Sequence, residues 1–202
     1  MNVTDREAPP VAADAEIIGS SLAEPEHFAV LFDRHAPLIF RYVARRVGRE
    51  AADDLVAETF LAAFSKRLRY DQGYPDARPW LYGIATKLIS QYRRDEFRQY
   101  RIRRVIVTDP DLPGHEDRVA ADETARAVRG PLAAALAALP DDDRDVLLLI
   151  AWEQLTYEET ARALGIPSGT VRSRLSRARS RIRAALASAG TSDTIREILG
   201  HE

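Results

Sequence analysis

The stretch Thr156–Ile182, TYEETARALGIPSGTVRSRLSRARSRI, determines how the C-terminal part of this chain is expected to fold. Thr156 can cap a helix, and Glu159 three positions later can bond back to it, which completes a capping box. Gly165 is a typical helix stop, and Pro167 cannot simply continue the same helix. The pattern therefore predicts a short helix that ends in a tight turn.

Apolar residues recur at helical spacing on both sides of this turn, and Ser168 can cap a second helix after it. The two apolar stripes are Tyr157, Ala161 and Leu164 before the turn, and Val171, Leu175, Ala178 and Ile182 after it. Because such a stripe covers one side of a helix, both helices are expected to pack on a shared core through these residues.

The opposite face of the second helix combines arginine with small hydroxyl residues. Its members are Arg172, Ser173, Ser176, Arg177 and Ser180, flanked by Arg174, Arg179, Arg181 and Arg183. The fork of Arg fits guanine edges and phosphates, and Ser allows a close approach of the backbone. These features predict a helix-turn-helix that reads the major groove. The alternative is an amphipathic helix with a solvated arginine face, although no Asp or Glu occurs between Thr160 and Ser192 to balance the charge.

The composition of the 202 residues allows one large domain or two small ones. Hydrophobic residues make up 46% and charged residues 30%, and the net charge of −2 hides a strong segregation of charge along the chain. Residues 1–30 and 109–123 are acidic, whereas residues 87–104 hold seven basic residues against two acids. This alternation favours separate basic surfaces that are joined by acidic connectors.

Several classes of protein are disfavoured by what the sequence lacks. There is no Cys, and the four His are scattered, so we expect no disulfide, no metal site and no cofactor. No signal peptide or membrane-spanning run is visible, which leads us to expect a cytoplasmic protein without membrane insertion. No clustered carboxylates with a nearby base and no activated Ser or Tyr are apparent, so we expect no catalytic residue, and a DNA-cutting or DNA-joining enzyme is disfavoured.

Helical periodicity runs through the chain without any strand pattern, so the predicted fold class is all-α, with two small helical domains joined by a flexible acidic linker. We expect a disordered acidic leader over residues 1–24, an N-terminal domain over 25–105, a linker over 106–130, a four-helix helix-turn-helix domain over 131–188 and a tail over 189–202.

Three helices are predicted in the N-terminal domain. The first starts at Glu26, should kink or break at Pro37 and should stop at Gly48. The second, over residues 49–66, places its apolar residues inward and leaves Asp53, Asp54 and Glu58 on its polar side. Acids on a helix face are most often plain solvated surface.

The third helix has Pro79 in its first turn, with Trp80 and Tyr82 near its start. A basic track follows: Lys87, Arg93, Arg94, Arg98, Arg101, Arg103 and Arg104. Aromatic side chains beside basic ones can form a platform for single-stranded nucleic acid, because rings stack on bases and cations follow the backbone. The alternative is that these aromatics are simply core residues.

Four motifs, taken in this order, resemble the extracytoplasmic-function (ECF) sigma factors, the two-domain bacterial initiation factors of the sigma-70 family. They are DDLVAETFLAAF (53–64), PWLYGIATKL (79–88) with YRR (92–94), LPDDDRDVLLL (139–149) and GTVRSRLSRAR (169–179). The similarity extends over about residues 26–187, so residues 25–105 would be sigma region 2 and residues 131–188 sigma region 4.

The resemblance implies a protein that binds core RNA polymerase and promoter DNA, recognises the −35 and −10 elements and promotes strand opening. The residues implied for the clamp helices of the polymerase's largest subunit are Asp54, Glu58, Leu55 and Phe60. Those implied for the −10 element, where a base is flipped into a protein pocket, are Trp80, Tyr82, Lys87, Gln91, Arg93 and Arg94. Those implied for the −35 element are Arg172, Ser173, Ser176, Arg177, Arg174 and Thr170. An anti-sigma factor is also expected as a partner.

This chain departs from the family pattern at four positions, one of which is Ser176, a small residue where some relatives carry a bulkier one. At the other three, Ala57 stands where Gln is frequent, Lys87 where Asn is common and Gln91 where Asp is common. The main alternative function is a stand-alone regulator that dimerises on a palindromic operator without polymerase. Trp80 and the basic track argue against it, because such a regulator needs no surface for melted strands.

Overall fold

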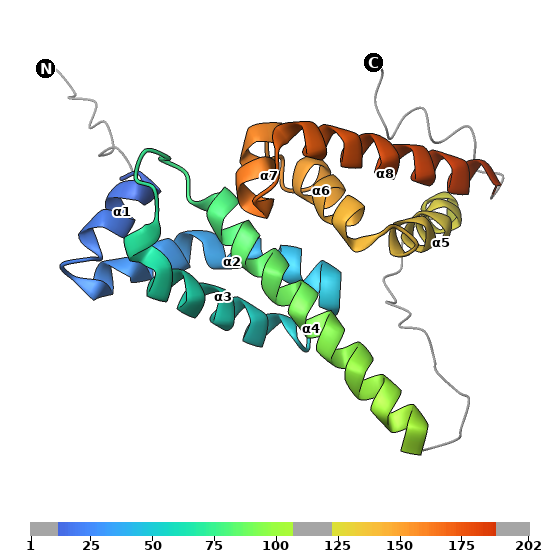
Figure 1. Ribbon diagram of the computed structural model, residues 1–202, viewed down its shortest axis with the longest axis horizontal. Helices are drawn as coiled ribbons and strands as arrows, with labels where there is room; N and C mark the ends of the chain where they lie inside the picture. The colour runs from blue at the N-terminus through green and yellow to red at the C-terminus, as the bar shows by residue number, and fades with distance from the viewer. Residues whose placement is uncertain (1–11, 107–122, 189–202) are drawn as a thin grey trace, which may run out of the picture. The chain divides into compact units, whose positions relative to one another are not determined.

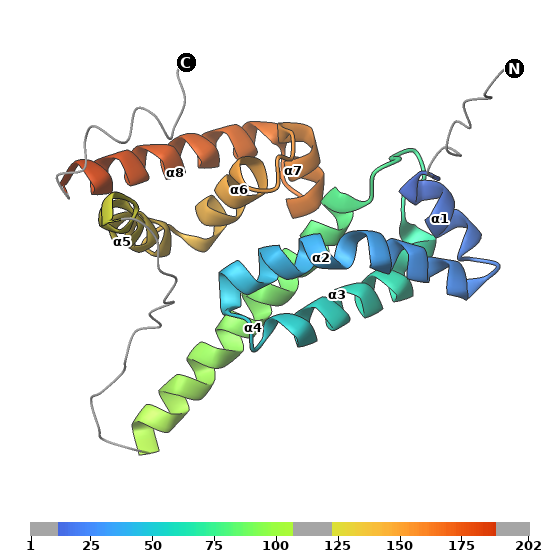
Figure 2. The same cartoon turned by 180° about the vertical axis from the view of Figure 1, so that it is seen from behind.

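A computed structural model describes residues 12–106 and 123–188, and every regular element in these two ranges is helical (Figures 1 and 2). The chain divides into two compact units, residues 1–89 and 90–202, and the division falls within one long helix. The prediction of an all-α chain with two helical domains is confirmed. No helix in the described ranges is both long and apolar enough to cross a membrane.

The N-terminal unit is built on a pair of helices that run side by side, α2 and α3 (Figure 1). Its elements are α1 (Asp14–Ser20), the 3-10 turn η1 (Pro25–His27), α2 (Phe28–Val47), α3 (Ala52–Lys66), the 3-10 turn η2 (Arg67–Arg69) and the first part of α4 (Arg78–Ile106). Leu31, Tyr42 and Leu81 are among its fully buried side chains, so α2 and α4 both contribute to one core.

Pro37 lies inside α2 and does not break it, so of the two expected outcomes, a kink or a break, the break is wrong. Its ring lies on the exposed side of the helix, where water can bond to the carbonyl that the proline leaves without a donor. Leu31 and Ile39 are buried on either side of it, so both halves of the helix pack on the core. Gly48 ends α2 with a φ of 86°, as expected of a glycine stop.

The prediction of a disordered leader over residues 1–24 is wrong for its second half. Residues 14–20 form α1, which buries Ile17 and Ile18 in the core of the N-terminal unit. The acidic average of the segment concealed these two apolar residues, and the carboxylate of Asp14 is itself buried among partners. Residues 1–11 lie outside the described ranges.

The C-terminal unit contains the four helices expected for its domain. They are α5 (Glu123–Ala137), α6 (Asp141–Ala151), α7 (Tyr157–Leu164) and α8 (Ser168–Ser188). Their shared core is formed by Ala135, Leu139, Val146, Leu147, Val171, Leu175, Ala178, Ile182 and Leu186. The packing of α6, α7 and α5 on α8 explains why the short α7 is stable, because an isolated helix of this length would not be.

The predicted linker over residues 106–130 extends too far toward the C-terminus. Helix α5 starts at Glu123 and continues through Gly130 and Pro131, which the sequence suggested as a boundary. A proline inside a helix removes one backbone hydrogen bond, and the other bonds of the helix remain on both sides. Residues 107–122 and the predicted tail from 189 lie outside the described ranges.

Candidate nucleic-acid interface

The turn between α7 and α8 has the geometry that its sequence predicts. The Glu159 amide donates to Thr156 Oγ1 at 3.2 Å, and the Thr156 amide donates to Glu159 Oε2 at 2.8 Å, which closes the capping box. Gly165 ends α7 in the left-handed conformation, with φ 66°, and the Ile166 amide donates to the Ala161 carbonyl at 3.0 Å. These bonds fix the direction in which α8 leaves the turn.

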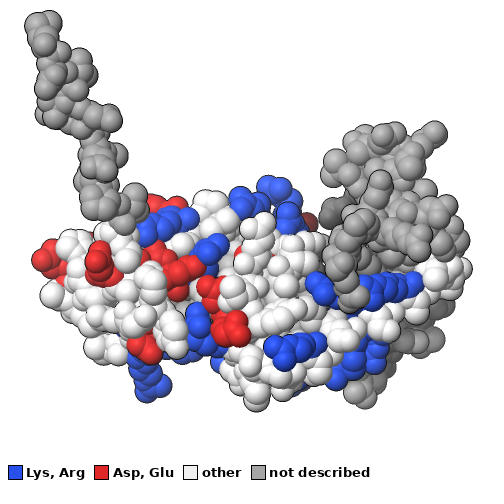
Figure 3. Space-filling view, turned by 90° about the horizontal axis from the view of Figure 1, so that it is seen from above, with Lys and Arg blue, Asp and Glu red and all other residues white. Residues whose placement is uncertain are grey.

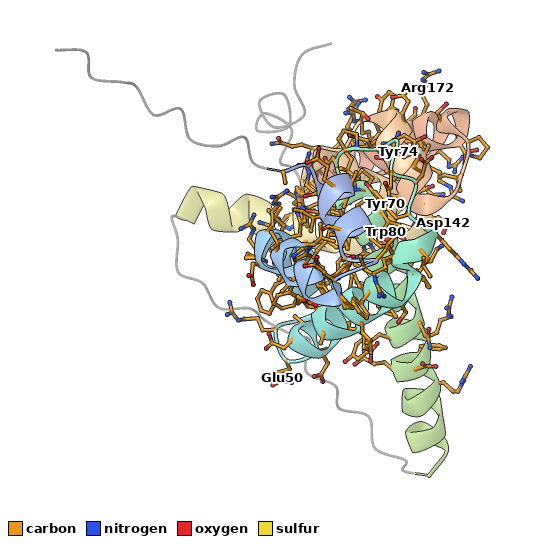
Figure 4. The ribbon with its side chains drawn as sticks, turned by 90° about the vertical axis from the view of Figure 1, so that its left-hand side faces the viewer. Glu50, Tyr70, Tyr74, Trp80, Asp142 and Arg172 are labelled. Atoms are coloured by element: carbon orange, nitrogen blue, oxygen red, sulfur yellow. The ribbon has the colours of Figure 1, made fainter. Side chains whose placement is uncertain are left out.

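Helix α8 has one buried face and one exposed face, as the periodicity predicts. Val171, Leu175, Ala178 and Ile182 are all buried. Arg172, Ser173, Ser176 and Arg177 are exposed, whereas Thr170 and Arg174 are partly buried. The Arg172 guanidinium lies 5.9 Å from the centre of the Tyr157 ring, and Figure 4 shows this side chain at the periphery of its unit. Blue Lys and Arg groups recur over the part of the surface where α8 lies (Figure 3).

Carboxylates at the start of α6 pair with three arginines of α8, which the sequence did not reveal. Arg174 Nη2 lies 2.7 Å from Asp142 Oδ2, and Arg177 Nη2 lies 3.1 Å from Asp143 Oδ1. Arg181 Nη1 lies 3.5 Å from the second oxygen of Asp143. The Asp143 side chain is 5% exposed, so it is an internal anchor for two exposed arginines.

A signal for this anchor was available in the sequence. The three acids at the start of α6, Asp141 to Asp143, suit the positive end of a helix. Asp143, however, precedes Val146 by three positions and Leu147 by four, which places it on the core-facing side of α6. A carboxylate on a buried helix face requires a partner, and arginine is the usual one.

Three aromatic residues gather where α4 begins (Figure 4). The Tyr70 and Trp80 rings lie 4.9 Å apart at an angle of 55°, and the Tyr70 hydroxyl donates to the Tyr74 carbonyl at 2.6 Å. Trp80 is partly exposed, and Tyr74 is 40% exposed. The sequence pointed to Trp80 but not to Tyr70 or Tyr74. Two tyrosines in a short loop with Gly and Pro were the signal that could have identified them.

The loop that carries Tyr74 is held by its own hydrogen bonds. Asp71 Oδ1 accepts from the Gly73 amide at 3.0 Å, and the Asp71 carbonyl accepts from the Tyr74 amide at 3.1 Å. Asp76 Oδ1 accepts from the Arg78 amide at 2.8 Å, which gives the first amide of α4 a partner. The loop 70–77 therefore has a defined shape in which Tyr74 is presented at the surface.

Tyr82 was predicted to contact the −10 element, and this prediction is wrong for the folded chain. Its side chain is 1% exposed and packs edge-on against the Tyr42 ring, with ring centres 5.2 Å apart. Tyr42 in turn shares a hydrogen bond with Thr86 at 2.8 Å. Tyr82 is a core residue that joins α4 to α2.

The other predicted −10 residues lie along α4. Lys87, Gln91 and Arg94 are exposed, and Arg93 is partly exposed. Trp80, Lys87, Gln91 and Arg94 follow one another at intervals of seven, four and three, so they share one face of the helix. An aromatic ring at the start of the face and cations further along it suit a strand that runs beside α4.

The four residues expected to contact polymerase separate into two pairs. Leu55 and Phe60 are buried, and the Phe60 ring packs edge-on against Phe32 at 4.8 Å, so the prediction that they form the contact is wrong. Asp54 and Glu58 are exposed. Leu61, which the sequence did not single out, is 67% exposed and lies three positions beyond Glu58. The outer face of α3 therefore combines two carboxylates with an apolar side chain.

Two family models match separate parts of this chain. Residues 31–99 match the family model for Sigma-70 region 2, and residues 129–182 match that for Sigma-70, region 4. Among solved structures, CnrH in complex with the cytosolic domain of CnrY aligns with a TM-score of 0.61 at 24% identity, over 87% of this chain and 97% of that one. The sigma factor RpoE of Bartonella quintana, in complex with the anti-sigma factor NepR, aligns with a TM-score of 0.59 at 24% identity, over 79% and 96%. At these identities the structures show a shared fold.

Similar proteins include two ECF RNA polymerase sigma factors. SigL of Mycobacterium tuberculosis is 34% identical over 163 residues, which span 80% of this chain and 89% of that protein. EcfG of Rhodopseudomonas palustris is 34% identical over 157 residues, which span 75% and 82%. Both sigma-70 regions are matched in the expected order, and SigL is matched over most of its length; the chain belongs to the ECF RNA polymerase sigma factors of the sigma-70 family.

Proposed function

We propose that this sigma factor directs core RNA polymerase to promoters through two separate DNA surfaces, α8 for the −35 element and the aromatic cluster with α4 for the −10 element. The observation that carries the proposal is the two-sided α8, which follows a helix-turn-helix turn and presents Arg and Ser outward while its apolar stripe is buried. A face of this kind fits a major groove, where base edges and phosphates are both within reach.

The −35 surface consists of Thr170, Arg172, Ser173, Arg174, Ser176 and Arg177. Arg172 and Arg177 differ in how they are held. Arg172 lies over the Tyr157 ring, whereas Arg177 is oriented by the buried carboxylate of Asp143. A guanidinium that is already oriented loses less side-chain entropy when it binds a base edge, so Arg177 is the stronger candidate for reading a guanine.

The −10 surface combines Tyr70, Tyr74 and Trp80 with Lys87, Gln91, Arg93 and Arg94. A base that leaves the opening duplex can be received by the exposed aromatic side chains, because stacking on a ring takes the place of stacking on the neighbouring bases. The cations of α4 would follow the phosphates of the same strand. Tyr82 is excluded from this surface because it is buried.

For the polymerase contact we propose the outer face of α3. Asp54 and Glu58 offer charge to the clamp helices of the largest subunit, and Leu61 adds apolar area beside them. Polymerase carries out the phosphoryl chemistry in the cytoplasm, and this chain supplies recognition and strand opening. CnrH and RpoE were each solved with a bound partner, and we infer that an anti-sigma factor controls this chain as well.

The division into two small modules has a physical consequence for affinity. A single recognition helix buries a modest area on DNA, so neither module is expected to bind tightly alone. When polymerase holds both modules, the second contact becomes effectively intramolecular and gains from a high local concentration. Tight binding of this chain to a promoter should therefore require the polymerase.

The test is transcription by reconstituted holoenzyme. The full chain is mixed with core polymerase and a library of promoters, and run-off products are sequenced. Transcripts that require both the chain and particular −35 and −10 elements support the proposal. A chain that binds an inverted repeat as a dimer and has no effect on polymerase would support the regulator alternative instead.

A further inference from the structure

The first residue of α1 connects three parts of the N-terminal unit that are far apart in sequence. The Asp14 carboxylate, 5% exposed, accepts hydrogen bonds from His35 Nε2 at 2.8 Å, from Arg34 Nη1 at 2.6 Å and from the Ala77 amide at 2.9 Å. His35 and Arg34 belong to α2, and Ala77 is the last residue of loop 70–77. One side chain thus ties α1 and α2 to the end of the loop.

These bonds favour the ionised carboxylate despite its burial. Burial by itself would raise the pKa of Asp14, but the hydrogen bonds from His35, the Ala77 amide and Arg34, together with the electrostatic attraction of His35, hold the pKa below its ordinary value. Charge-assisted bonds are stronger than neutral ones and more expensive to leave unmade. The Ala77 backbone is therefore fixed more firmly than a loop residue normally is.

Two further contacts place α1 against the same loop. A Cβ atom added to Gly19 would lie 3.2 Å from Nε2 of Gln72, so the last turn of α1 closely approaches the middle of the loop. Arg67, which lies just before the loop, donates from Nε to the Ser21 carbonyl at 3.4 Å. Helix α1 thus lies against the loop at its middle and at its end, and the residue that follows α1 bonds to Arg67 ahead of the loop.

The bond between Asp14 and Ala77 matters because Ala77 lies between two aromatic residues of the proposed −10 surface. Ala77 lies three residues after Tyr74 and three before Trp80, and the Tyr70 hydroxyl bonds to the Tyr74 carbonyl. A shift of Ala77 would move Tyr74 and the start of α4 relative to each other, and the spacing between the Tyr74 and Trp80 side chains would change.

We infer that Asp14 is a positioning residue for promoter opening: it holds loop 70–77 so that Tyr74 and Trp80 are correctly placed to receive a base from the −10 element. The inference rests on the proposed function of the aromatic cluster. Asp14 touches no DNA in this scheme and acts through the loop. Asn in its place has one acceptor oxygen instead of two and carries no charge, so the bond to the Ala77 amide would no longer be charge-assisted and the Arg34 bond could not be kept with it, at little change in volume.

The test uses holoenzyme made with the full-length chain carrying Asp14→Asn, with Glu16→Gln as the matched control, since Glu16 is an exposed acid on the same helix. The readout is the preference of holoenzyme for a single-stranded −10 oligonucleotide over one with a substituted base. Loss of one charge-assisted bond is expected to lower this preference about tenfold. Asp14→Asn should assemble with core polymerase and bind a −35 duplex as the unchanged chain does. Glu16→Gln should match the unchanged chain in all three measurements.

Tyr74→Ala separates this inference from the proposed function. If Tyr74→Ala leaves the preference unchanged, the proposed −10 role of the loop is wrong. If Tyr74→Ala lowers it, Asp14→Asn should add little to Tyr74→Ala, because both act on the same loop. Fully additive losses, or an unchanged preference for Asp14→Asn alone, would overturn the positioning role.

A DNA-free measurement keeps the inference testable if Asp14→Asn weakens the fold. In a Trp152→Phe background, Trp80 is the remaining tryptophan of the chain. The fluorescence emission of Trp80 should shift in Asp14→Asn at temperatures well below the unfolding midpoint. Circular dichroism determines that midpoint. An emission spectrum that stays unchanged in the folded variant would contradict the role of Asp14 in placing the aromatic cluster.

Discussion

Helix α8 and loop 70–77 present their side chains by different physical means. In α8 the direction of each residue follows from the helix itself, because the buried stripe fixes the rotation and the outward face is then determined. In the loop, direction depends on bonds to distant positions, such as the 63-residue separation between Asp14 and Ala77. Changes on α8 should therefore act locally, whereas the loop should be sensitive to residues that never meet DNA.

The largest effect is expected from Leu175→Ala, which removes a buried side chain from the stripe of α8. Loss of such a residue typically costs about 2–5 kcal/mol of unfolding free energy. Chemical denaturation of the chain should show this loss in the C-terminal unit. The exposed neighbour Ser176→Ala is the control and should be close to neutral, and equal costs at the two positions would show that the face assignment of α8 is wrong.

Trp80→Ala tests the aromatic cluster that loop 70–77 and the start of α4 form. Stacking of a base on an aromatic side chain is worth about 1–3 kcal/mol, so open-complex formation should fall about tenfold to a hundredfold on every promoter. Permanganate reactivity of −10 thymines measures opening, and a band shift on a −35 duplex should be unaffected. Trp152→Ala, an exposed tryptophan of the C-terminal unit, serves as the control. Normal opening by Trp80→Ala would make Trp80 a packing residue only.

Arg177→Ala should act at a single promoter position. A bidentate contact between Arg and a base edge is worth about 1–3 kcal/mol of discrimination, so selection from a randomised −35 element should relax at one base pair. Arg183→Ala, further along α8, should weaken binding evenly across sequences. A uniform loss with Arg177→Ala would assign this residue to phosphate instead.

The smallest effect is expected from Asp143→Asn, which removes the anchor of Arg177 and Arg181. The two guanidinium groups are about half exposed, so the change in stability should stay below about 1 kcal/mol. Without the competing carboxylate, non-specific DNA binding should strengthen and its salt dependence should steepen. Discrimination at the Arg177 position should fall at the same time. Stronger binding with full discrimination would mean that Asp143 only screens charge.

The two surfaces also differ in how much of them could be predicted from sequence. The capping box, the Gly165 turn and both faces of α8 follow from local pattern, because a helix repeats its geometry every few residues. The same periodicity puts Asp143 on the core-facing side of α6 but could not identify its partners on α8. It could not place Asp14, because the partners of this residue lie on α2 and in loop 70–77. Composition likewise failed for α1, where two buried isoleucines outweigh an acidic average.

The errors at single residues have related causes. Tyr82 is buried because α4 packs through more of its circumference than one apolar stripe suggests, and Tyr42 of α2 covers it. Helical periodicity places Leu55 and Phe60 on the inward face, whereas the family resemblance assigns them to the polymerase contact. Both side chains are buried, which agrees with the inward placement. Leu61 was overlooked because single exposed apolar residues are common on protein surfaces, and such a residue indicates a contact site only when its neighbours in space are known.

The central claim is that two DNA surfaces become effective only when polymerase carries both. The most direct measurement is binding of one promoter fragment by the free chain and by holoenzyme, with the −35 and −10 elements intact or scrambled singly. The account predicts weak binding by a monomeric free chain, and tight binding by holoenzyme that disappears when either element is scrambled. A free chain that binds the promoter as tightly as holoenzyme, as a symmetric dimer on an inverted repeat, would contradict it.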